Sequence, residues 1–341
     1  IYRYTAVNIA VGGTLRATGN YALVIQSQSD IDIAGLIDLT GAAGDTGFSG
    51  DGSEGETETE PGEPTGGAGG IGGPGGYAGG AGGNAVTGVD GGHLPGVTGF
   101  GPGGGRGGYD GDLQATDSDP VTEFELRSRE GGGGAGHGDD GGDSDQATST
   151  NKGDGLGGTG GEEYGEPDFS DAPTVNLVPT LTQGFGGSGG GGGGAEDDSG
   201  LISNNPPNTG VGDDIPANDD EGGGGGGGGG GALQLTAYGD ISLLGQIICN
   251  GGRGGDTEDP SANIGQGQGG GGGSGGAIWI QANGNLTLGS STVLVCDGGV
   301  GGNFSTLRQG GGGAVGYIYM QDTDGDISGI ADATIRPDAT T

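Results

Sequence analysis

The stretch ALVIQSQSDIDIAGLIDLTGAAG at residues 22–44 decides the fold, because related stretches recur further along the chain. They read ALQLTAYGDISLLGQIICNGGRG at 232–254 and AIWIQANGNLTLGSSTVLVCDGGVG at 277–301, and a degenerate fourth copy starts at Ala314. In the first three copies apolar residues alternate with polar ones, as in a strand with one buried face. A unit that returns along the chain in this way is typical of solenoid proteins.

The alternating apolar positions keep the same spacing in each copy. They are Leu23, Ile25, Ile31 and Ile33 in the first, Leu233, Leu235, Ile241 and Leu243 in the second, and Ile278, Ile280, Leu286 and Leu288 in the third. A short polar break separates two strands, and a third apolar segment follows, which is the outline of one β-helix coil. We therefore predict an all-β fold, a short right-handed parallel β-helix with essentially no α-helix.

This prediction divides the chain into coils and insertions within a single elongated domain. The coils are expected at 1–44, 232–254, 277–301 and 314–337. Long glycine-rich, acidic insertions are expected at 45–231, 255–276 and 302–313. The first insertion is either one very large loop or a loop that contains further degraded coils, and the sequence leaves both readings open.

Glycine supplies 100 of the 341 residues, so side-chain burial cannot order most of this chain. Residues 66–84 read GGAGGIGGPGGYAGGAGGN, and this period of three matches an extended left-handed helix of the polyproline II type. Two edges of such a helix carry only glycine, so neighbouring chains can approach closely and pair their backbone groups. We predict polyglycine II-like insertions that pack as a bundle. Irregular, flexible spacers are the alternative.

The cassette and the GGx triplets resemble those of glycine-rich β-solenoid surface proteins of microbes. The triplet region also resembles the polyglycine II bundles of certain phage tail-fibre adhesins and of a glycine-rich antifreeze protein. The resemblance covers about half of the chain. It implies a structural or adhesive protein that is extracellular or lies on a cell or virion surface. The high acidity and the irregular connecting stretches depart from the antifreeze type and argue against ice binding.

Composition removes several classes of partner and of chemistry. The formal net charge of −37 repels nucleic acid and anionic membrane surfaces, and no apolar run reaches the length of a membrane-spanning helix. We expect neither nucleic-acid binding nor membrane insertion. Two cysteines and two histidines leave little for catalysis, so we expect a non-enzymatic protein with no organic cofactor. A polysaccharide-degrading β-helix that uses carboxylates such as Asp30 and Asp32 is a weaker alternative.

Two acidic clusters are candidate calcium sites. Their members are Asp322, Asp324 and Asp326 in one cluster and Asp139, Asp143 and Asp145 in the other. Several carboxylates on a glycine-bent backbone suit a hard cation such as Ca²⁺. Solvated turns, in which Asp accepts hydrogen bonds from nearby backbone amides, are the alternative.

Cys249 and Cys296 occupy equivalent places in two successive copies. Stacked coils put equivalent residues about 4.8 Å apart, which is within the range of a disulfide. Both cysteines also take an inward position that Leu39 fills in the first copy, so two buried thiols acting as small hydrophobic groups fit equally well. The sequence does not choose between them.

The two ends of the predicted solenoid are the candidate assembly surfaces. Open coil ends expose unpaired backbone groups and invite another chain to stack on them. The alternating end residues are Ile1, Tyr2, Tyr4, Val7 and Ile335. We expect copies of the chain itself as partners, in an extracellular filament or surface fibre. The alternative is an adhesin that binds surface glycans through the aromatic residues Tyr77, Phe100, Tyr109 and Tyr164.

Overall fold

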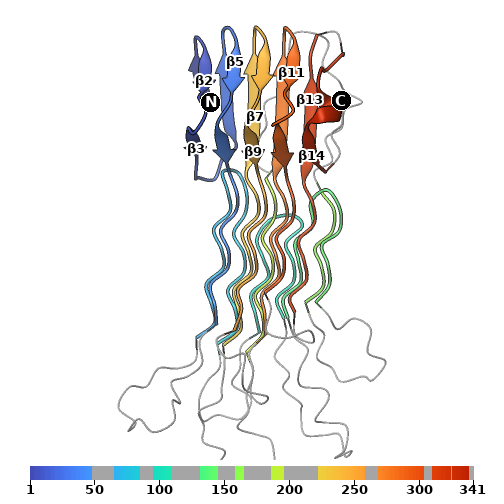
Figure 1. Cartoon of the computed structure of the whole chain (residues 1–341). Helices are drawn as coiled ribbons and strands as arrows, with labels where there is room; N and C mark the ends of the chain where they lie inside the picture. Colours follow the sequence, from blue (N-terminus) through green and yellow to red (C-terminus); the bar gives the residue numbers. More distant parts are fainter. Residues whose placement is uncertain are drawn as a thin grey trace, which may run out of the picture.

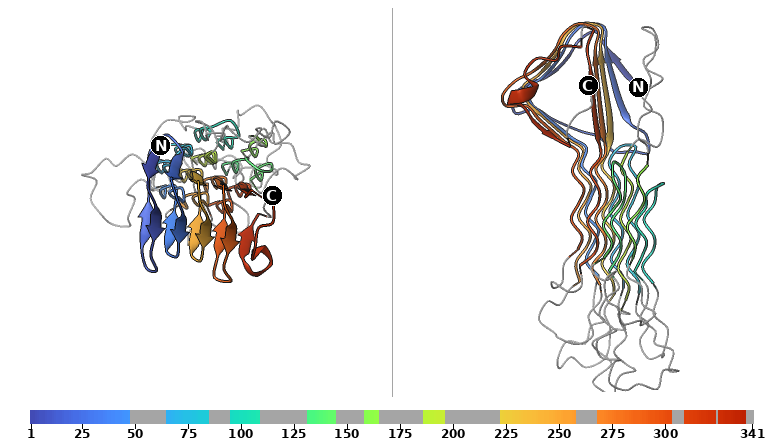
Figure 2. Two further views of the ribbon diagram at one scale, coloured as in Figure 1. Left: turned by 90° about the horizontal axis from the view of Figure 1, so that it is seen from above. Right: turned by 90° about the vertical axis from the view of Figure 1, so that its right-hand side faces the viewer.

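Three parallel β-sheets wind into a solenoid, and a bundle of extended glycine-rich segments leaves one corner of it (Figure 1, Figure 2). This is a computed structural model. The residues that it describes are 1–47, 65–84, 95–108, 131–144, 158–164, 186–195, 222–257, 268–302, 309–323 and 325–337. The predicted all-β, parallel β-helix-like architecture is confirmed.

The described strands form five coils of three sides each. Coil 1 contains β1 (Tyr2–Tyr4), β2 (Val7–Ile9) and β3 (Thr14–Arg16). Coil 2 contains β4 (Leu23–Ser27), β5 (Ile31–Ile33) and β6 (Leu36–Asp38). Coil 3 contains β7 (Ala232–Ala237), β8 (Ile241–Leu243) and β9 (Gln246–Ile248). Coil 4 contains β10 (Ala277–Ala282), β11 (Leu286–Leu288) and β12 (Val293–Val295). Coil 5 contains β13 (Tyr317–Gln321), the short 3-10 helix η2 (Ile330–Asp332) and β14 (Thr334–Arg336).

Corresponding sides of the coils pair in register. Sheet A has the order β1-β4-β7-β10-β13, sheet B the order β2-β5-β8-β11, and sheet C the order β3-β6-β9-β12-β14. In coil 5 Ser328 takes the place of a sheet B strand, through a bridge to Thr287. Residues 1–44 thus hold two coils. In the described parts of 45–231 no strand interrupts the step from β6 to β7, so these parts belong to one very large insertion.

The core of the solenoid consists of aliphatic side chains that point inward from all three sheets. In β5, for example, Ile31 and Ile33 are buried while Asp32 between them is exposed. The largest fully buried side chains are Ile31, Ile33, Ile37, Leu39, Leu233, Leu235, Ile241, Leu243, Ile247, Ile278, Ile280 and Leu286. They are the alternating residues of the repeated sequence, so side-chain burial holds this region together.

Polar side chains stack at the corner between sheets A and B. Oδ1 of Asp30 accepts a hydrogen bond from the Asp240 amide at 2.9 Å, and Oδ1 of Asp240 accepts one from the Asn285 amide at 2.7 Å. In each case the side chain of one coil binds the backbone of the next coil. We call this row the Asx ladder. The strand register gives the equivalent position in each coil. It is Ala6 in coil 1, Asp30 in coil 2, Asp240 in coil 3, Asn285 in coil 4 and Asp326 in coil 5.

Backbone hydrogen bonds between chain segments hold the bundle, and residues 222–231 show the pattern most clearly. Residues 223, 226 and 229 donate to the segment 76–84, residues 224, 227 and 230 to 268–276, and residues 225, 228 and 231 to 39–47. Their carbonyl groups accept from 65–73, 186–195 and 249–257. These N···O distances lie between 2.7 and 3.0 Å. One threefold chain surrounded by six others is the packing expected of polyglycine II-like helices.

Glycine is required at most positions where one bundle segment faces another. A Cβ atom on Gly226 would lie 2.0 Å from Gly190 O, which is far inside van der Waals contact. The described residues of the segments 131–137, 186–195, 222–231 and 268–276 are all buried. Outer segments instead carry a side chain on every third residue, and that edge faces solvent: Ile71 is 72% exposed.

Two tight turns, next to the solenoid, reverse the chain from one bundle segment to the next. Gly75 has φ of 78° and Gly101 has φ of 102°, a region that residues with a Cβ rarely adopt. The first turn is fixed to the solenoid, because Gly75 N donates to Gly19 O at 3.0 Å and Pro74 O accepts from Ala232 N at 2.8 Å. The bundle is therefore attached to coils 2 and 3 by more than its covalent connections.

Among the residues that the structure describes, no helix has the length and the apolar character needed to cross a membrane.

Candidate functional site

The coil 1 end of the solenoid leaves its interior partly uncovered. Val7, Ile9 and Leu15 point toward the core but are only half-buried. Their neighbours one coil further in, Ile31 and Ile37, are 0% exposed. No described strand lies beyond β1, β2 and β3, so each of the three sheets has an edge strand at this end.

Two tyrosines stand at the same open end. Tyr2 pairs with Ile25 and Tyr4 pairs with Ser27, so both occupy positions whose partners in coil 2 are buried. Tyr2 is nevertheless 58% exposed and Tyr4 48% exposed. Together with Ile1 at 65%, they place large apolar surface beside an unpaired strand edge. Four of the five residues predicted for assembly, Ile1, Tyr2, Tyr4 and Val7, thus come together at this end.

The coil 5 end is more closed on one side than on the others. Ile318 and Met320 in β13 are 2% and 0% exposed, so sheet A keeps its core to the last strand. Ile327 and Ile335 are partly buried, on the sides of sheets B and C. Ile335, the fifth predicted assembly residue, therefore lies at the opposite end of the molecule from the other four.

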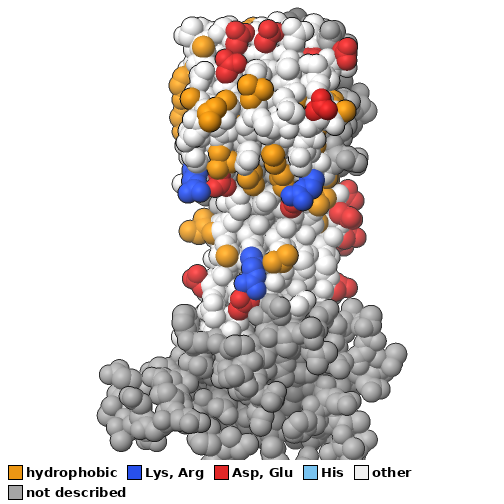
Figure 3. All heavy atoms as spheres, viewed as in Figure 1, with side chains coloured by type: hydrophobic (Ala, Val, Ile, Leu, Met, Phe, Trp, Pro, Cys, Tyr) orange, Lys and Arg blue, Asp and Glu red, His pale blue; other side chains and the backbone are white. Residues whose placement is uncertain are grey.

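The two ends differ in charge. Residues 1–29 contain Arg3 and Arg16 and no acidic residue, whereas residues 317–337 contain four aspartates and one arginine. On the face seen in Figure 3, the few basic side chains lie beside acidic ones. The described ion pairs are Arg16–Asp38 at 2.9 Å, Arg253–Asp256 at 2.6 Å and Arg336–Asp297 at 2.9 Å.

Asp322 closes a turn at the coil 5 end. Its Oδ1 accepts from Gly325 N at 2.8 Å and its Oδ2 from Leu286 N at 3.4 Å, and the residue is 6% exposed. This is the turn-forming role that was the alternative to calcium binding. Asp324 lies outside the described residues. Within the described chain, no group of three His, Cys, Asp or Glu side chains is arranged to hold a metal ion.

The second predicted calcium cluster also binds backbone amides. Asp143 Oδ1 accepts from Gly160 N at 2.8 Å, and Asp139 Oδ1 accepts from Asp140 N at 2.9 Å. Asp145 lies outside the described residues. The described carboxylates therefore fix turns and neighbouring segments of the bundle, and calcium binding by these clusters stays a prediction.

Cys249 and Cys296 lie one coil apart, as the sequence predicts, and both are free thiols in the core. Cys249 N donates to Val295 O at 2.8 Å, which continues the β9–β12 register. Burial raises the pKa of the Cys296 thiol well above its usual value, and the neighbouring Cys249 adds to the effect. Of the two readings, the structure has the buried thiols, which fill the core as small hydrophobic groups.

A buried aromatic cluster joins the bundle to the solenoid. The His137 ring stacks on Tyr164 with centroids 4.7 Å apart and meets the edge of Tyr317 at 5.0 Å. Nδ1 of His137 lies 2.6 Å from Gly275 O, so this nitrogen carries a proton, while Nε2 is buried without a partner in the described chain. Burial lowers the pKa of His137 to about 4. No spacing signal in the sequence links these residues, because they belong to separate bundle segments and to β13.

The predicted glycan-binding aromatics differ in exposure. Phe100 is 56% exposed, but Tyr77 and Tyr164 are only partly exposed. Tyr164 donates its hydroxyl to Gly186 O at 2.6 Å, and burial raises the pKa of this phenol. Packing on His137 thus leaves Tyr164 only part of its ring for contact with a glycan. Tyr109 lies outside the described residues.

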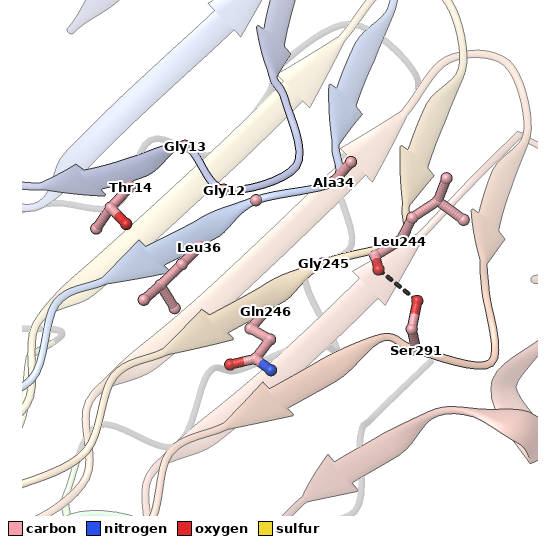
Figure 4. Close-up of a pocket in the computed structure, with 10 residues that line it drawn as sticks. Gly12, Gly13, Thr14, Ala34, Leu36, Leu244, Gly245, Gln246 and Ser291 are labelled. Carbon is pink, nitrogen blue, oxygen red and sulfur yellow. Dashed lines mark hydrogen bonds between the residues drawn. The ribbon is translucent and has the colours of Figure 1, made fainter.

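A shallow groove of about 330 Å³ crosses the corner between sheets B and C. Thr14, Leu36 and Gln246 lie along it on neighbouring strands, and Ser291 Oγ donates to Leu244 O at 2.5 Å (Figure 4). Its lining residues include no carboxylate. Asp30 belongs to the Asx ladder at a different corner, and Asp32 is exposed on sheet B. The carboxylates named for polysaccharide cleavage thus do not line this groove.

Comparisons of the chain with protein families, with curated proteins and with solved structures found no match. The resemblance to surface fibre proteins therefore rests on the repeated cassette and the glycine triplets alone.

Proposed function

We propose that this protein is a non-enzymatic structural subunit of an extracellular filament or surface fibre, and that it assembles with copies of itself through the ends of its solenoid. The open first coil is the observation that carries the proposal. Three strand edges, two exposed tyrosines and a half-buried apolar interior lie together there. A second chain that covered them would pair the backbone and bury the apolar groups.

The bundle supports a mechanical role for the same protein. Its central segment, residues 222–231, carries no side chain, and every edge of this segment is used in pairing with neighbours. Such a segment resists bending because any displacement breaks hydrogen bonds to several neighbours at once. A rigid rod attached to each subunit suits a fibre better than it suits a soluble enzyme.

Removal of the first seven residues tests the proposal. This change deletes β1 and breaks β2, and it leaves coils 2 to 5 intact. We expect the shortened chain to keep its β-rich circular dichroism spectrum and to form no filaments under the electron microscope. The control is Val11→Ser, at an 86% exposed position of the same coil, which should still assemble. Filaments of undiminished length from the shortened chain would refute the proposal.

A second candidate function, that of an adhesin, is favoured by where the bundle ends. The described segments run to the side of the bundle that is remote from the solenoid (Figure 2). Between these segments, the sequence stretches 48–64, 85–94, 109–130, 145–157, 196–221, 258–267 and 303–308 lie outside the described residues. More than half of the chain's 46 acidic residues belong to these stretches, so they form a distinct chemical region of the sequence.

Replacement of 109–130 by a glycine-serine linker of equal length tests the adhesin function. An adhesin should lose binding to its target cells or to a glycan array while filament formation continues. A structural subunit should show unchanged assembly and no binding to lose.

A further inference from the structure

We propose that the filament contact is head to tail, with coil 5 of one copy stacked on coil 1 of the next in the register that coils keep inside the chain. This inference rests on the proposed function and names the partner surface for it. The partner is a second copy of this chain, and each interface joins two different ends of the molecule. Such a contact repeats without closing and generates a filament.

The strand register continues across this contact without a change of side-chain direction. Extension of the pairing puts Tyr2 beside Met320 in sheet A and Leu15 beside Ile335 in sheet C. In sheet B it puts Val7 beside Ile327. Each of these pairs joins inward positions, so the apolar rows of the core run on from one subunit to the next.

The Asx ladder has a direction, and that direction favours the same arrangement. Inside the chain, the side chains of Asp30 and Asp240 each accept a hydrogen bond from the backbone amide of the following coil. Asp326 holds the ladder position in the last coil, and the following coil in the filament is coil 1 of the next copy, which offers the Ala6 amide. A carboxylate accepts several donors, as Asp240 Oδ1 does from two groups of Asn285. In a contact between two coil 1 ends, both copies would bring Ala6 to the interface, and its side chain cannot accept a hydrogen bond.

The charges of the two ends also favour the head-to-tail contact over a contact between two coil 1 ends. Coil 1 carries Arg3 and Arg16 without an acidic residue, and coil 5 is rich in aspartate, so the unlike ends attract and two coil 1 ends repel. One like pair remains, since the register puts Arg16 beside Arg336. Both of these guanidinium groups are largely exposed, and each is bound to an aspartate of its own chain, so the repulsion is small.

The corner between sheets B and C also has room for the proposed contact. Coil 5 carries η2 between sheets B and C, whereas coil 1 has Gly12 and Gly13 at the same corner. A Cβ atom on Gly12 would have no atom within 4 Å. The small residues of coil 1 can therefore face the bulkier corner of coil 5.

Cysteine cross-linking tests the register. Thr14 and Thr334 are exposed and become direct neighbours across the proposed contact, about 4.8 Å apart. The double variant Thr14→Cys, Thr334→Cys should give a ladder of covalent dimers, trimers and longer chains on mild oxidation and non-reducing electrophoresis. The matched variant Thr14→Cys, Arg336→Cys places the second thiol two residues out of register and should cross-link at least fivefold less.

The outcomes separate this inference from the proposed function. Dimers from Thr14→Cys alone would mean that two coil 1 ends meet, which overturns the head-to-tail contact but not self-assembly. Filaments that form without any cross-link in the double variant would likewise overturn the register alone. A chain that stays monomeric in analytical ultracentrifugation at every concentration would end both proposals. The double variant should keep the β-rich circular dichroism spectrum of the unchanged chain, which excludes misfolding as the cause of a missing cross-link.

Discussion

The solenoid and the bundle are stabilised by opposite kinds of contact. In the solenoid, aliphatic side chains such as Ile241 and Leu235 are 0% exposed and fill the space between three sheets. In the bundle, the interior is made of backbone, and residues 222–231 bring no side chain to it. Loss of a side chain should damage the first region, and gain of one should damage the second.

This comparison explains how one chain can use glycine so heavily without losing its fold. Each glycine costs conformational entropy on ordering and returns no apolar burial. In an interior segment, backbone hydrogen bonds offset this cost, because amide and carbonyl groups of neighbours on all three edges pair with it. An isolated segment of this kind would have no internal hydrogen bonds, so the bundle is stable only as a whole.

The largest effect is expected from a methyl group added inside the bundle. In Gly226→Ala the new Cβ would lie 2.0 Å from Gly190 O, so two segments must separate and lose hydrogen bonds. We expect a loss of more than about 3 kcal/mol in the free energy of unfolding. Thermal unfolding followed by circular dichroism measures it.

Gly312→Ala is the matched control. It lies in a bundle segment too, but its Cβ would have only Gly299 O near it, at 3.9 Å. Here we expect a gain of about 0.5 kcal/mol, because alanine restricts the unfolded chain more than glycine does. Equal losses in the two variants would show that glycine spacing does not determine the stability of the bundle.

In the solenoid, the removal of a side chain is the informative change. Ile241→Ala leaves a cavity in the middle of the core and should cost about 2–5 kcal/mol in denaturant unfolding. Ile71→Ala, at a position that is 72% exposed on the bundle, should change stability by less than about 0.5 kcal/mol. Similar effects at both sites would break the distinction between the two regions.

The junction of the two regions should respond to acid. The pKa of His137 is lowered from 6.5 to about 4 by burial, so below pH 6.5 the unfolded chain binds a proton that the folded chain does not. Stability from this residue is complete above pH 6.5 and falls as the pH drops toward 4, by roughly 3 kcal/mol in all.

His137→Phe removes this dependence, although it also leaves Gly275 O without its donor at every pH. The test is the difference in unfolding free energy between pH 7 and pH 4. We expect this difference to be smaller in the variant than in the unchanged chain. The same difference in both proteins would contradict the buried, neutral imidazole.

The smallest effect concerns the cysteines. Since Cys249 and Cys296 are free thiols, a reducing agent should leave the melting temperature unchanged, and Cys249→Ala should cost only about 1 kcal/mol through lost packing. A melting temperature that falls by several degrees with reductant would point to a disulfide instead.

The repeated part of the sequence predicts most of the solenoid, because each inward position leaves a periodic signal. The alternation of Ile31 and Ile33 with Asp32 is enough to orient a strand. Coil 1 is harder to recognise, since its short strands carry Tyr2 and Tyr4 where other coils have buried residues. In the degenerate coil 5, a single bridge at Ser328 replaces the strand of sheet B.

In the bundle, the length of a glycine run predicts burial, and the triplets predict which edge faces solvent. Residues 222–231 are ten glycines and are surrounded on every side, whereas GGx segments such as 65–73 lie at the outside. Which segments become neighbours is not encoded locally, because glycine pairs equally well with any glycine. The contact of His137 with Tyr164 and Tyr317 depends on that arrangement, so the sequence gives no sign of it.

The central position of residues 222–231 has a consequence for the order of folding. Of their six neighbours, four precede them in the chain and two, 249–257 and 268–276, follow them. As the chain emerges from the ribosome, the early segments must wait for later ones before their amides find partners. Contacts between residues so distant in sequence close slowly, so we expect the bundle to form late and in one cooperative step after the coils have nucleated.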